Sequence, residues 1–536
     1  AIYSPSSLLQ LARARGRSTM AIALPAFLLL LPLFSIAAVF LLHAHARRTH
    51  KPAAPYPLLG HLPQFLANRH RILDWITEVL ARQPTSTLVF HRPGGERGVI
   101  TANPANLEHV MRAGFHNYPK GPRFASALHD FLGHGILNVD GHAWRAQRKA
   151  ASYEFNTRSL RLFVARTVHG ELHGRLLPLL RRAAGSGRKI DLQDTLERYA
   201  FDNICRVAFD HDPRQLPDGD ADESAATVTE SSRFADAFRD AANLSAGRFR
   251  YAVPGLWKVK KALNLGSERR LRESIAVVHG FADRIIRSRR EEMSMGCEKH
   301  DLLSRFMASQ GESYTETALR DVVISFLLAG RETTSSALTW FFWLLSSRPD
   351  VERRIRDEVA AVRARRAISD LNRAGFDLEE LREMHYVHAA ITESMRLYPP
   401  VPVNSVQARA ADVLPDGTAV GAWWFVSYNS YAMGRMESVW GEDARAYRPE
   451  RWLDPDPAEA TFRPESPFRY IVFHAGPRIC LGKEMAYIQM KSIVASVVEE
   501  FEVAVDGGYT PRQVASLTLR MADGLPVRVK DFRGGN

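Results

Sequence analysis

The sequence predicts a mainly α-helical protein with a smaller β region, arranged as a single large domain behind an N-terminal transmembrane helix. Residues 140–400 combine the apolar spacing of amphipathic helices with abundant Ala, Leu, Arg and Glu, which favour helix. A hairpin is expected near residues 86–103, and short strands with a turn at residues 416–417 follow the helical part. Residues 20–42 form the apolar run that predicts the transmembrane helix.

Composition and charge narrow the class of protein. The chain has 536 residues, of which 46% are hydrophobic and 24% charged, as in a globular protein with a large core. No repeat or long Gly/Ser linker divides the sequence, so we expect one large domain over residues 64–536. The net charge of +12 is spread over segments in which acids accompany bases, so we expect no nucleic-acid partner. The three cysteines form no C-x-x-C pair, which argues against disulfide frameworks and zinc sites.

The apolar run from Ala21 to Leu42 is long enough for the roughly 20 residues that cross a bilayer. We interpret residues 20–42 as a membrane anchor, because the apolar core of a secretory signal is only about 7–15 residues long. Residues 43–63 are rich in proline and predict a stiff hinge. Met20 directly precedes the run, which makes residues 1–19 a candidate upstream extension. The basic residues Arg47, Arg48 and Lys51 follow the run and place the large domain in the cytosol, although Arg13, Arg15 and Arg17 oppose this orientation.

One stretch near the C-terminus, FHAGPRICLGKEM, encloses Cys480 between Gly476 and Gly482, with Arg478 two residues upstream. A cysteine just before a helix gains N–H groups that lower its thiol pKa, and a thiolate is a strong soft ligand. The glycines allow a close approach to a flat macrocycle, and Arg478 can pair with a propionate. We therefore interpret Cys480 as the axial ligand of a haem iron. The alternatives are a nucleophilic cysteine with His474 as its base, and a core cysteine in a turn.

The full box, F-x-x-G-x-R-x-C-x-G, begins at Phe473 and resembles the haem-binding loop of the cytochrome P-450 family. Other signatures of that family occur in the family's order along nearly the whole chain. The stretches YPKGPRFASALHDFLGHGILNVDGHAWRAQRKAASYEF, MGRMESVWGED and the cysteine box are similar to the plant membrane-bound branch that hydroxylates fatty acids at the chain terminus. The resemblance implies the cytochrome P-450 fold, haem b as the cofactor, and residues 64–536 as the haem-thiolate monooxygenase domain.

The segment AGRETTSS interrupts a long apolar helix that we expect over residues 319–346. Gly330 loosens the helix and leaves space for a small ligand, while Thr and Glu side chains can hold water. In the family that the sequence resembles, this kink lies over the iron, and an acid and an alcohol deliver protons to dioxygen. The resemblance assigns these catalytic roles to Glu332 and Thr333. A helix interior with polar surface residues is the alternative.

Two further pairs gain meaning from the resemblance. Glu393 and Arg396 share a helical face and would otherwise be read as an exposed ion pair. The resemblance adds Arg451 of the PERW segment and implies a buried structural network on the haem side. Trp144 and Arg148 match residues that bind a haem propionate in the family. A surface stack of the two side chains is the alternative.

No dinucleotide-binding motif or P-loop is recognisable in the sequence. We therefore expect electrons from NADPH to arrive through a separate NADPH-cytochrome P-450 reductase, for which Arg145 and Lys149 offer a basic surface. The resemblance implies a lipophilic substrate, O₂ as co-substrate, and single-pass anchoring in the endoplasmic reticulum membrane with the catalytic domain cytosolic.

The resemblance implies terminal (omega) hydroxylation of a fatty acid, with jasmonoyl-amino acid conjugates and sterol side chains as alternatives. A non-oxygenase haem binder and a haem-thiolate isomerase are alternatives of another class, and the acid and alcohol pair disfavours both. Terminal selectivity requires a narrow apolar channel, because primary C–H bonds are harder to oxidise than secondary ones. Lys120 and Arg123 are candidates to bind the carboxylate. Candidate lining residues are Phe131, Leu132, Phe326, Leu327, Val401 and Val403.

Overall fold

The protein is described by a computed structural model. It describes residues 55–56, 59–155, 159, 163–216, 225–251, 255–299, 301–308, 314–366, 373–456 and 461–532. The expected extension at residues 1–19 and anchor at residues 20–42 lie outside this range, as does most of the hinge at residues 43–63. Within the described part of the chain, no helix is long and apolar enough to cross a membrane.

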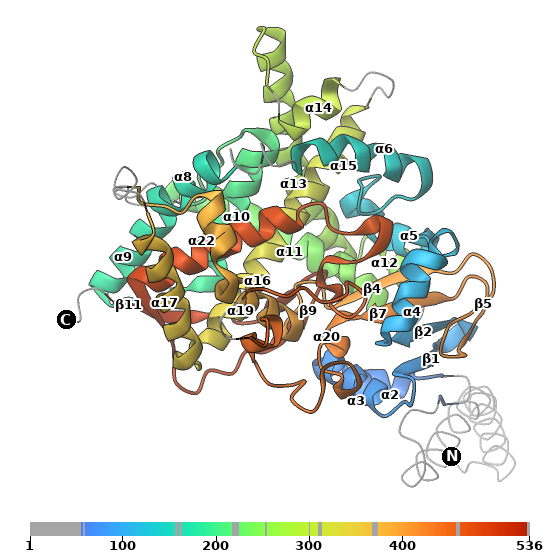
Figure 1. Ribbon diagram of the computed structural model, residues 1–536. Helices are drawn as coiled ribbons and strands as arrows, with labels where there is room; N and C mark the ends of the chain where they lie inside the picture. Colours follow the sequence, from blue (N-terminus) through green and yellow to red (C-terminus); the bar gives the residue numbers. More distant parts are fainter. Residues whose placement is uncertain are drawn as a thin grey trace, which may run out of the picture.

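Helices make up most of the fold, and the smaller β region lies to one side of them, as Figure 1 shows. The predicted fold class is therefore confirmed for the large domain. The helices around the centre include α3 (Ile72–Ala81), α5 (Gly121–Leu132), α6 (Gly141–Ser152), α10 (Leu192–Phe209), α11 (Ala225–Gly247), α12 (Leu256–Ala262), α13 (Ser267–Ser294), α15 (Glu316–Leu327), α16 (Thr333–Leu345), α17 (Pro349–Ala364), α19 (His385–Leu397) and α22 (Lys483–Glu500).

The long apolar helix predicted over residues 319–346 is present as α15 and α16, but a π-helical turn at Leu328–Glu332 separates them. The helix begins earlier than expected, because the Thr315 side chain accepts a hydrogen bond from the N–H of Ala318 and caps it. Helix α10 packs against both the π-helical turn and α16. A Cβ atom on Gly330 would lie 2.5 Å from Cγ1 of Ile204, so this close packing requires glycine in the turn.

The main sheet has four strands in the order β1-β2-β7-β4. The strands are β1 (Thr87–His91), β2 (Arg97–Thr101), β4 (Val403–Gln407) and β7 (Phe425–Asn429). The hairpin predicted near residues 86–103 is confirmed, with β1 antiparallel to β2 and Val89 opposite Val99. Strand β7 pairs in parallel with β2, which brings the C-terminal β segment against the N-terminal hairpin. The predicted turn at residues 416–417 is also confirmed, since it joins the antiparallel strands β5 (Asp412–Val413) and β6 (Ala419–Val420).

Another hairpin, formed by the C-terminal segment, lies near the centre of the molecule. It consists of β9 (Gln513–Ala515) and β10 (Leu519–Met521), with Ala515 opposite Leu519. The carbonyl of Leu519 accepts hydrogen bonds from Ser336 Oγ at 2.6 Å and from Trp340 Nε1 at 3.1 Å. These two bonds fix the hairpin to α16, so its tip keeps a constant position relative to the π-helical turn.

The connection between α11 and α12 begins with a 3₁₀ turn at Arg248–Arg250. The Arg248 guanidinium is buried and forms ion pairs with Asp130 and Glu268, each with a shortest N–O distance of 2.6 Å. It also donates a hydrogen bond to the carbonyl of Ala127 at 3.0 Å. The start of this connection is therefore held against α5 and α13.

Candidate functional site

A cavity of about 1390 Å³ lies between the π-helical turn, the Cys480 loop, the β9–β10 hairpin and the connection after α11. Its wall is predominantly apolar. Of the six predicted lining residues, Leu132, Phe326, Val401 and Val403 face the cavity. Phe131 and Leu327 do not line it, since both are packed in the hydrophobic core. Phe131 instead contacts the ring of Phe238 edge-on, with ring centroids 5.4 Å apart.

The Cys480 loop is tightly folded at the cavity wall. The N–H of Cys480 donates a hydrogen bond to the carbonyl of Phe473 at 2.8 Å, and α22 begins three residues later. Gly476 has a φ of +63°, and a Cβ atom there would lie 2.2 Å from the Met111 carbonyl oxygen. This glycine is therefore required for the loop to approach a neighbouring segment of the protein. Gly482 has no such close neighbour, because its nearest contact would be Phe155 at 3.6 Å.

The thiol of Cys480 lines the cavity next to several positive charges. Burial raises its pKa, while the N–H of Gly482 and the charges of Arg148 and Lys483 act in the opposite direction. His474 makes a hydrogen bond to Asn404 at 3.1 Å, and burial lowers the pKa of its imidazole to about 3. The histidine is therefore neutral and is turned to Asn404, an arrangement that argues against a Cys480–His474 nucleophilic pair.

Trp144, Arg148 and Arg478 lie together beside the Cys480 loop. The Arg478 guanidinium lies 4.5 Å from the centre of the Trp144 ring and donates hydrogen bonds to Asp140 at 2.6 Å and to the carbonyl of Val139 at 2.9 Å. Arg148 lies over the same ring, at 5.7 Å, and donates to the carbonyl of Ile479 at 2.8 Å. The residues predicted to bind a propionate therefore share one wall of the cavity.

Lys120 completes this cluster. From the sequence alone, it is a candidate to bind the substrate carboxylate. Its side chain is buried, and burial, followed by the charge of Arg478, lowers the pKa of its ammonium group to about 7. The Asp140 carboxylate acts on both Lys120 and Arg478, whereas the charge that acts on Arg148 is that of Cys480. Buried cations without matching anions are costly, and the two propionates of a haem would compensate them. Together with the soft Cys480 donor, these residues fit a haem.

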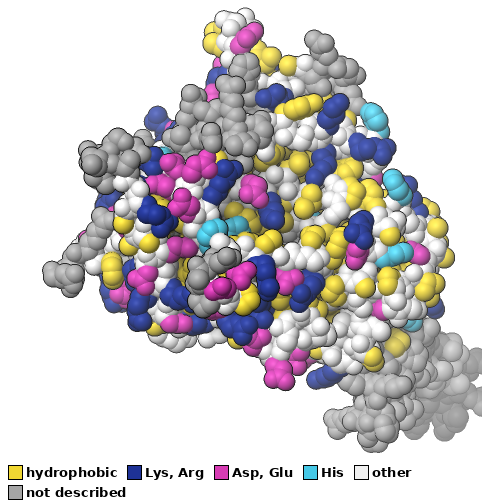
Figure 2. Space-filling model, in the orientation of Figure 1, with side chains coloured by type: hydrophobic (Ala, Val, Ile, Leu, Met, Phe, Trp, Pro, Cys, Tyr) yellow, Lys and Arg dark blue, Asp and Glu magenta, His cyan; other side chains and the backbone are white. Residues whose placement is uncertain are grey.

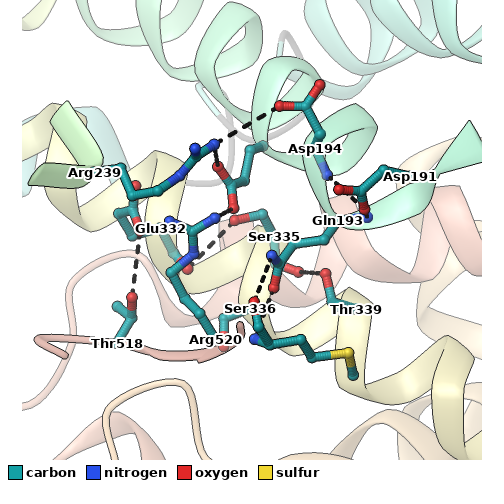
Figure 3. Close-up of polar contacts among 12 residues, drawn as sticks. Asp191, Gln193, Asp194, Arg239, Glu332, Ser335, Ser336, Thr339, Thr518 and Arg520 are labelled. Carbon is teal, nitrogen blue, oxygen red and sulfur yellow. Dashed lines mark hydrogen bonds and ion pairs between the residues drawn. The ribbon is translucent and has the colours of Figure 1, made fainter. Parts of the chain in front are cut away.

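Thr333 and Glu332 are neighbours in sequence but face different surroundings. The Thr333 hydroxyl donates a hydrogen bond to the carbonyl of Ala329 at 2.6 Å, and Thr333 lines the cavity together with Gly330. Glu332 is 2% exposed and does not line the cavity. Its carboxylate accepts hydrogen bonds from Arg331 and from Thr518 Oγ1, the latter at 3.3 Å (Figure 3).

Glu332 belongs to a buried ionic network that sequence reasoning missed. Arg331 also pairs with Glu197 of α10 at 2.9 Å, and Arg520 of β10 pairs with the same carboxylate. Arg239 of α11 lies 3.6 Å from Glu197 and 3.9 Å from Asp194, and Figure 3 shows its contact with Asp194. Although burial opposes ionisation, the charges of Arg331, Arg520 and Arg239 lower the pKa of Glu332. The carboxylate is therefore held ionised behind the cavity wall.

The structure brings Glu393, Arg396 and Arg451 together on the far side of α19. Glu393 and Arg396 form two parallel hydrogen bonds of 2.7 Å, and their side chains are 0% and 1% exposed. Arg451 Nε lies 3.4 Å from Glu393, and Trp452 Nε1 donates to the same carboxylate at 2.9 Å. Arg396 also donates to the carbonyls of Gly434, Ala444 and Ala446. The pair therefore joins α19 to the segment that precedes the Cys480 loop.

A mainly helical fold with a thiol and three cations around one apolar cavity defines a haem-thiolate protein, and comparisons with known proteins agree. The family model for cytochrome P-450 matches residues 50–522. The chain is 50% identical to cytochrome P-450 CYP94D108 of Paris polyphylla over 90% of this chain and 92% of that relative. It is 43% identical to cytochrome P-450 94A1 of Vicia sativa (89% and 90% covered) and 43% identical to cytochrome P-450 94B1 of Arabidopsis thaliana (90% and 92% covered).

The chain therefore belongs to the cytochrome P-450 family. It is a haem monooxygenase of the branch that these relatives represent, with a cysteine thiolate as the ligand of the haem iron. Its electrons come from a separate reductase partner. The resemblance inferred from the cysteine box and the other signatures is confirmed.

The buried Glu393 carboxylate provides a direct test of the structural network. Replacing Glu393 with alanine leaves Arg396 buried without its counter-charge, which we expect to destabilise the fold by about 3–5 kcal/mol. The prediction is a steep loss of haem-loaded protein, measured as the carbon monoxide difference spectrum per milligram of expressed chain. Glu442→Ala is the matched control. Glu442 is exposed in the loop after the short helix Glu437–Trp440, and its replacement is expected to retain normal haem content. Equal haem loading of the two variants would contradict the assignment.

Proposed function

We propose that the protein hydroxylates fatty acids at the terminal methyl group, with Cys480 as the axial ligand of its haem iron. The observation that carries the proposal is a single apolar cavity that both Cys480 and the π-helical turn with Thr333 face. The similarity of the YPKGPRF, MGRMESV and cysteine-box stretches to a fatty-acid-hydroxylating plant branch supports the substrate class. When bound, the haem supplies the activation of O₂ and the insertion of one oxygen atom into a C–H bond.

The residues around the cavity divide the remaining work. Arg148, Arg478 and Lys120 would hold the two propionates and thereby fix the plane of the macrocycle. The Thr333 hydroxyl would hold a proton at its Oγ1 next to the reacting atoms. Glu332, which is ionised at rest, would accept a proton behind the wall and pass it on toward the cavity, through a rearrangement of its bonds to Arg331 and Thr518. Apolar walls such as Leu132 and Phe326 would exclude water and hold an alkyl chain extended, so that its end is presented first.

An acidic substrate suits this cavity better than a neutral one. Arginine residues line the cavity outside the Cys480 region, among them Arg92, Arg123 and Arg250. Arg92 and Arg123 share the carboxylate of Glu96, whereas no carboxylate of the described residues lies at ion-pair distance from Arg250. A fatty acid or a jasmonoyl-amino acid conjugate would bring a carboxylate to Arg250, and a sterol would not. The unbranched chain of a fatty acid also requires no bulky pocket near the iron, which favours it over the conjugate.

Membrane association and the reductase surface are further parts of the proposal. Exposed apolar side chains gather on α12 and just after it, and they alternate with lysines: Leu256, Val259, Leu263, Leu265, Lys258, Lys260 and Lys261. Such an amphipathic surface suits the cytosolic face of the endoplasmic reticulum membrane, to which residues 20–42 would anchor the chain. Arg145 and Lys149 are exposed on α6, where Figure 2 shows Lys and Arg side chains, and they would contact an acidic NADPH-cytochrome P-450 reductase.

The substrate assignment is tested by competition. Microsomes that contain the protein and a plant reductase are offered dodecanoate, a jasmonoyl-isoleucine conjugate and a cholesterol-like sterol together, with NADPH. We expect dodecanoate to be oxidised preferentially, with mass spectrometry locating the new hydroxyl on the terminal carbon. Preferential oxidation of the conjugate or sterol would refute the substrate class. Mainly mid-chain products would refute the end-on presentation.

The role of the Thr333 hydroxyl is tested by the fate of electrons. Thr333→Ala removes the Oγ1 proton but should keep haem content, because the side chain faces the cavity rather than the core. We expect NADPH consumption to continue while product falls by about 10²- to 10⁴-fold and hydrogen peroxide rises, as for the loss of one proton-transfer group. Thr333→Ser, which restores the hydroxyl, should recover coupling. Equal coupling in the alanine, serine and unchanged proteins would remove Thr333 from the proton path.

A further inference from the structure

One end of the cavity is closed by the connection after α11 and by the β9–β10 hairpin. Arg250 and Tyr251 come from the connection, and Ala515, Ser516 and Leu517 come from the hairpin. The Arg250 guanidinium donates a hydrogen bond through Nη1 to the carbonyl of Ala515, so it bridges the two segments. A charged group therefore spans the two segments at this end of the cavity.

Several other cations on the cavity wall have carboxylate partners, and Arg148 lies instead beside the Cys480 thiol. Arg92 and Arg123 share Glu96, each at 2.7 Å, and Arg478 pairs with Asp140 at 2.6 Å. Two more lie at another part of the wall and are paired as well: Arg206 with Asp212 at 2.6 Å and Lys299 with Asp210 at 2.8 Å. Within the part of the chain that the structure describes, Arg250 has no carboxylate at ion-pair distance. The Arg250 side chain is exposed to solvent, and the protein around its guanidinium desolvates it in part and lowers its pKa.

A second polar group next to Arg250 also has no partner. The Ser516 hydroxyl lines the cavity, and its Oγ is buried without a hydrogen bond to any described residue. Ser516 directly follows Ala515, whose carbonyl already accepts from Arg250. Buried hydroxyls are normally satisfied, so an open donor beside an uncompensated guanidinium indicates an anionic acceptor from outside the chain.

We propose that Arg250, assisted by the Ser516 hydroxyl, binds the carboxylate of the substrate and so fixes how far the methyl end reaches toward Cys480. The geometry suits a fixed anchor. Arg248, two residues earlier, is held by Asp130 and Glu268, and the Tyr251 carbonyl accepts a hydrogen bond from Arg92 at 2.5 Å.

The other half of the anchor is tied to the catalytic end of the cavity. The hairpin that carries Ser516 is bound to α16 through Leu519, and α16 begins at Thr333. The distance between the carboxylate site and the π-helical turn is therefore set by one rigid unit, which would select substrates by chain length.

Arg123 and Lys120 fit this role less well. Arg123 is bound to Glu96 at 2.7 Å and lies over the ring of Phe425 at 4.4 Å. Lys120 belongs to the cluster beside Arg478 and Asp140. Both side chains are therefore already engaged, whereas Arg250 retains hydrogen-bond donors that face the cavity.

The inference rests on the proposed fatty-acid substrate, but its test measures the binding of the acid as well as its turnover. The haem-loaded protein is titrated with dodecanoate and with dodecan-1-ol, and each dissociation constant is taken from the substrate-induced shift of the haem spectrum. Arg250→Gln should weaken dodecanoate binding by about 10- to 100-fold, the range expected for a charged hydrogen bond, and change dodecanol binding by less than about twofold. Arg250→Lys should give an intermediate loss, since it keeps the charge but not the fork.

Two variants make the result specific. Arg353→Gln removes an exposed charge on α17 and should leave both dissociation constants unchanged. Ser516→Ala removes only the hydroxyl and should weaken dodecanoate binding by about 3- to 10-fold with no effect on the alcohol. It also keeps the inference testable if Arg250→Gln fails to load haem.

The outcomes separate this inference from the proposed function. Terminal hydroxylation of dodecanoate with equal acid binding in the unchanged, Arg250→Gln and Ser516→Ala proteins would overturn the anchor and leave the function standing. Equal losses for acid and alcohol would also overturn it, because they would indicate a structural role. Arg250-dependent acid binding without terminal hydroxylation would support the anchor while refuting the proposed function.

Discussion

The charge of the interior is the constraint on which the rest of the structure depends. Lys120 and Arg478 lie near the carboxylate of Asp140 beside the Cys480 loop, and Arg148 lies next to the Cys480 thiol. Such a cluster is costly in a protein interior unless an anion accompanies it. A haem satisfies this requirement with its propionates and uses the adjacent thiolate as its ligand. The proposed carboxylate anchor at Arg250 extends the same reasoning to the substrate, because a fatty acid would bring an anion to that guanidinium.

Much of the fold could be predicted because local sequence and tertiary packing agree. In the hairpin at residues 86–103, successive side chains point to opposite faces of two paired strands. The turn at residues 416–417 needs the left-handed backbone conformation that Gly417 adopts. The break in the helix at Gly330 was also predictable. The reason for the break could be predicted only in part. The missing side chain of Gly330 makes room for Ile204 of α10, and Ile204 is distant in sequence. Glu393 and Arg396 could be paired by helical spacing, but their burial depends on Trp452 and on carbonyls of the following segment.

The rest of the site could not be predicted, because it is assembled from segments far apart in the chain. Glu332 was expected beside the iron, yet Arg331, Arg520 and Glu197 surround its carboxylate behind the wall. Arg331 is adjacent to Glu332 in the chain, but Arg520 and Glu197 are distant in sequence and gave no signal. Adjacent apolar positions raise a similar difficulty: Leu132 faces the cavity while Phe131 faces the core, since a helix turns about 100° per residue. Arg250 gave no signal either, because the role proposed for it depends on which described residues lie around its guanidinium in the fold.

The carbon monoxide difference spectrum of the reduced protein tests the assignment of Cys480 as the haem ligand most directly. We expect the red-shifted Soret band of thiolate ligation in the unchanged protein and its loss in Cys480→Ser, because a serine oxygen cannot replace the soft thiolate donor. Cys297→Ser, which removes an exposed cysteine outside the cavity, is the matched control and should keep the band. A Cys480→Ser protein with the same red-shifted band, or an unchanged protein that binds haem without it, would contradict the assignment of Cys480 and the charge argument built around it.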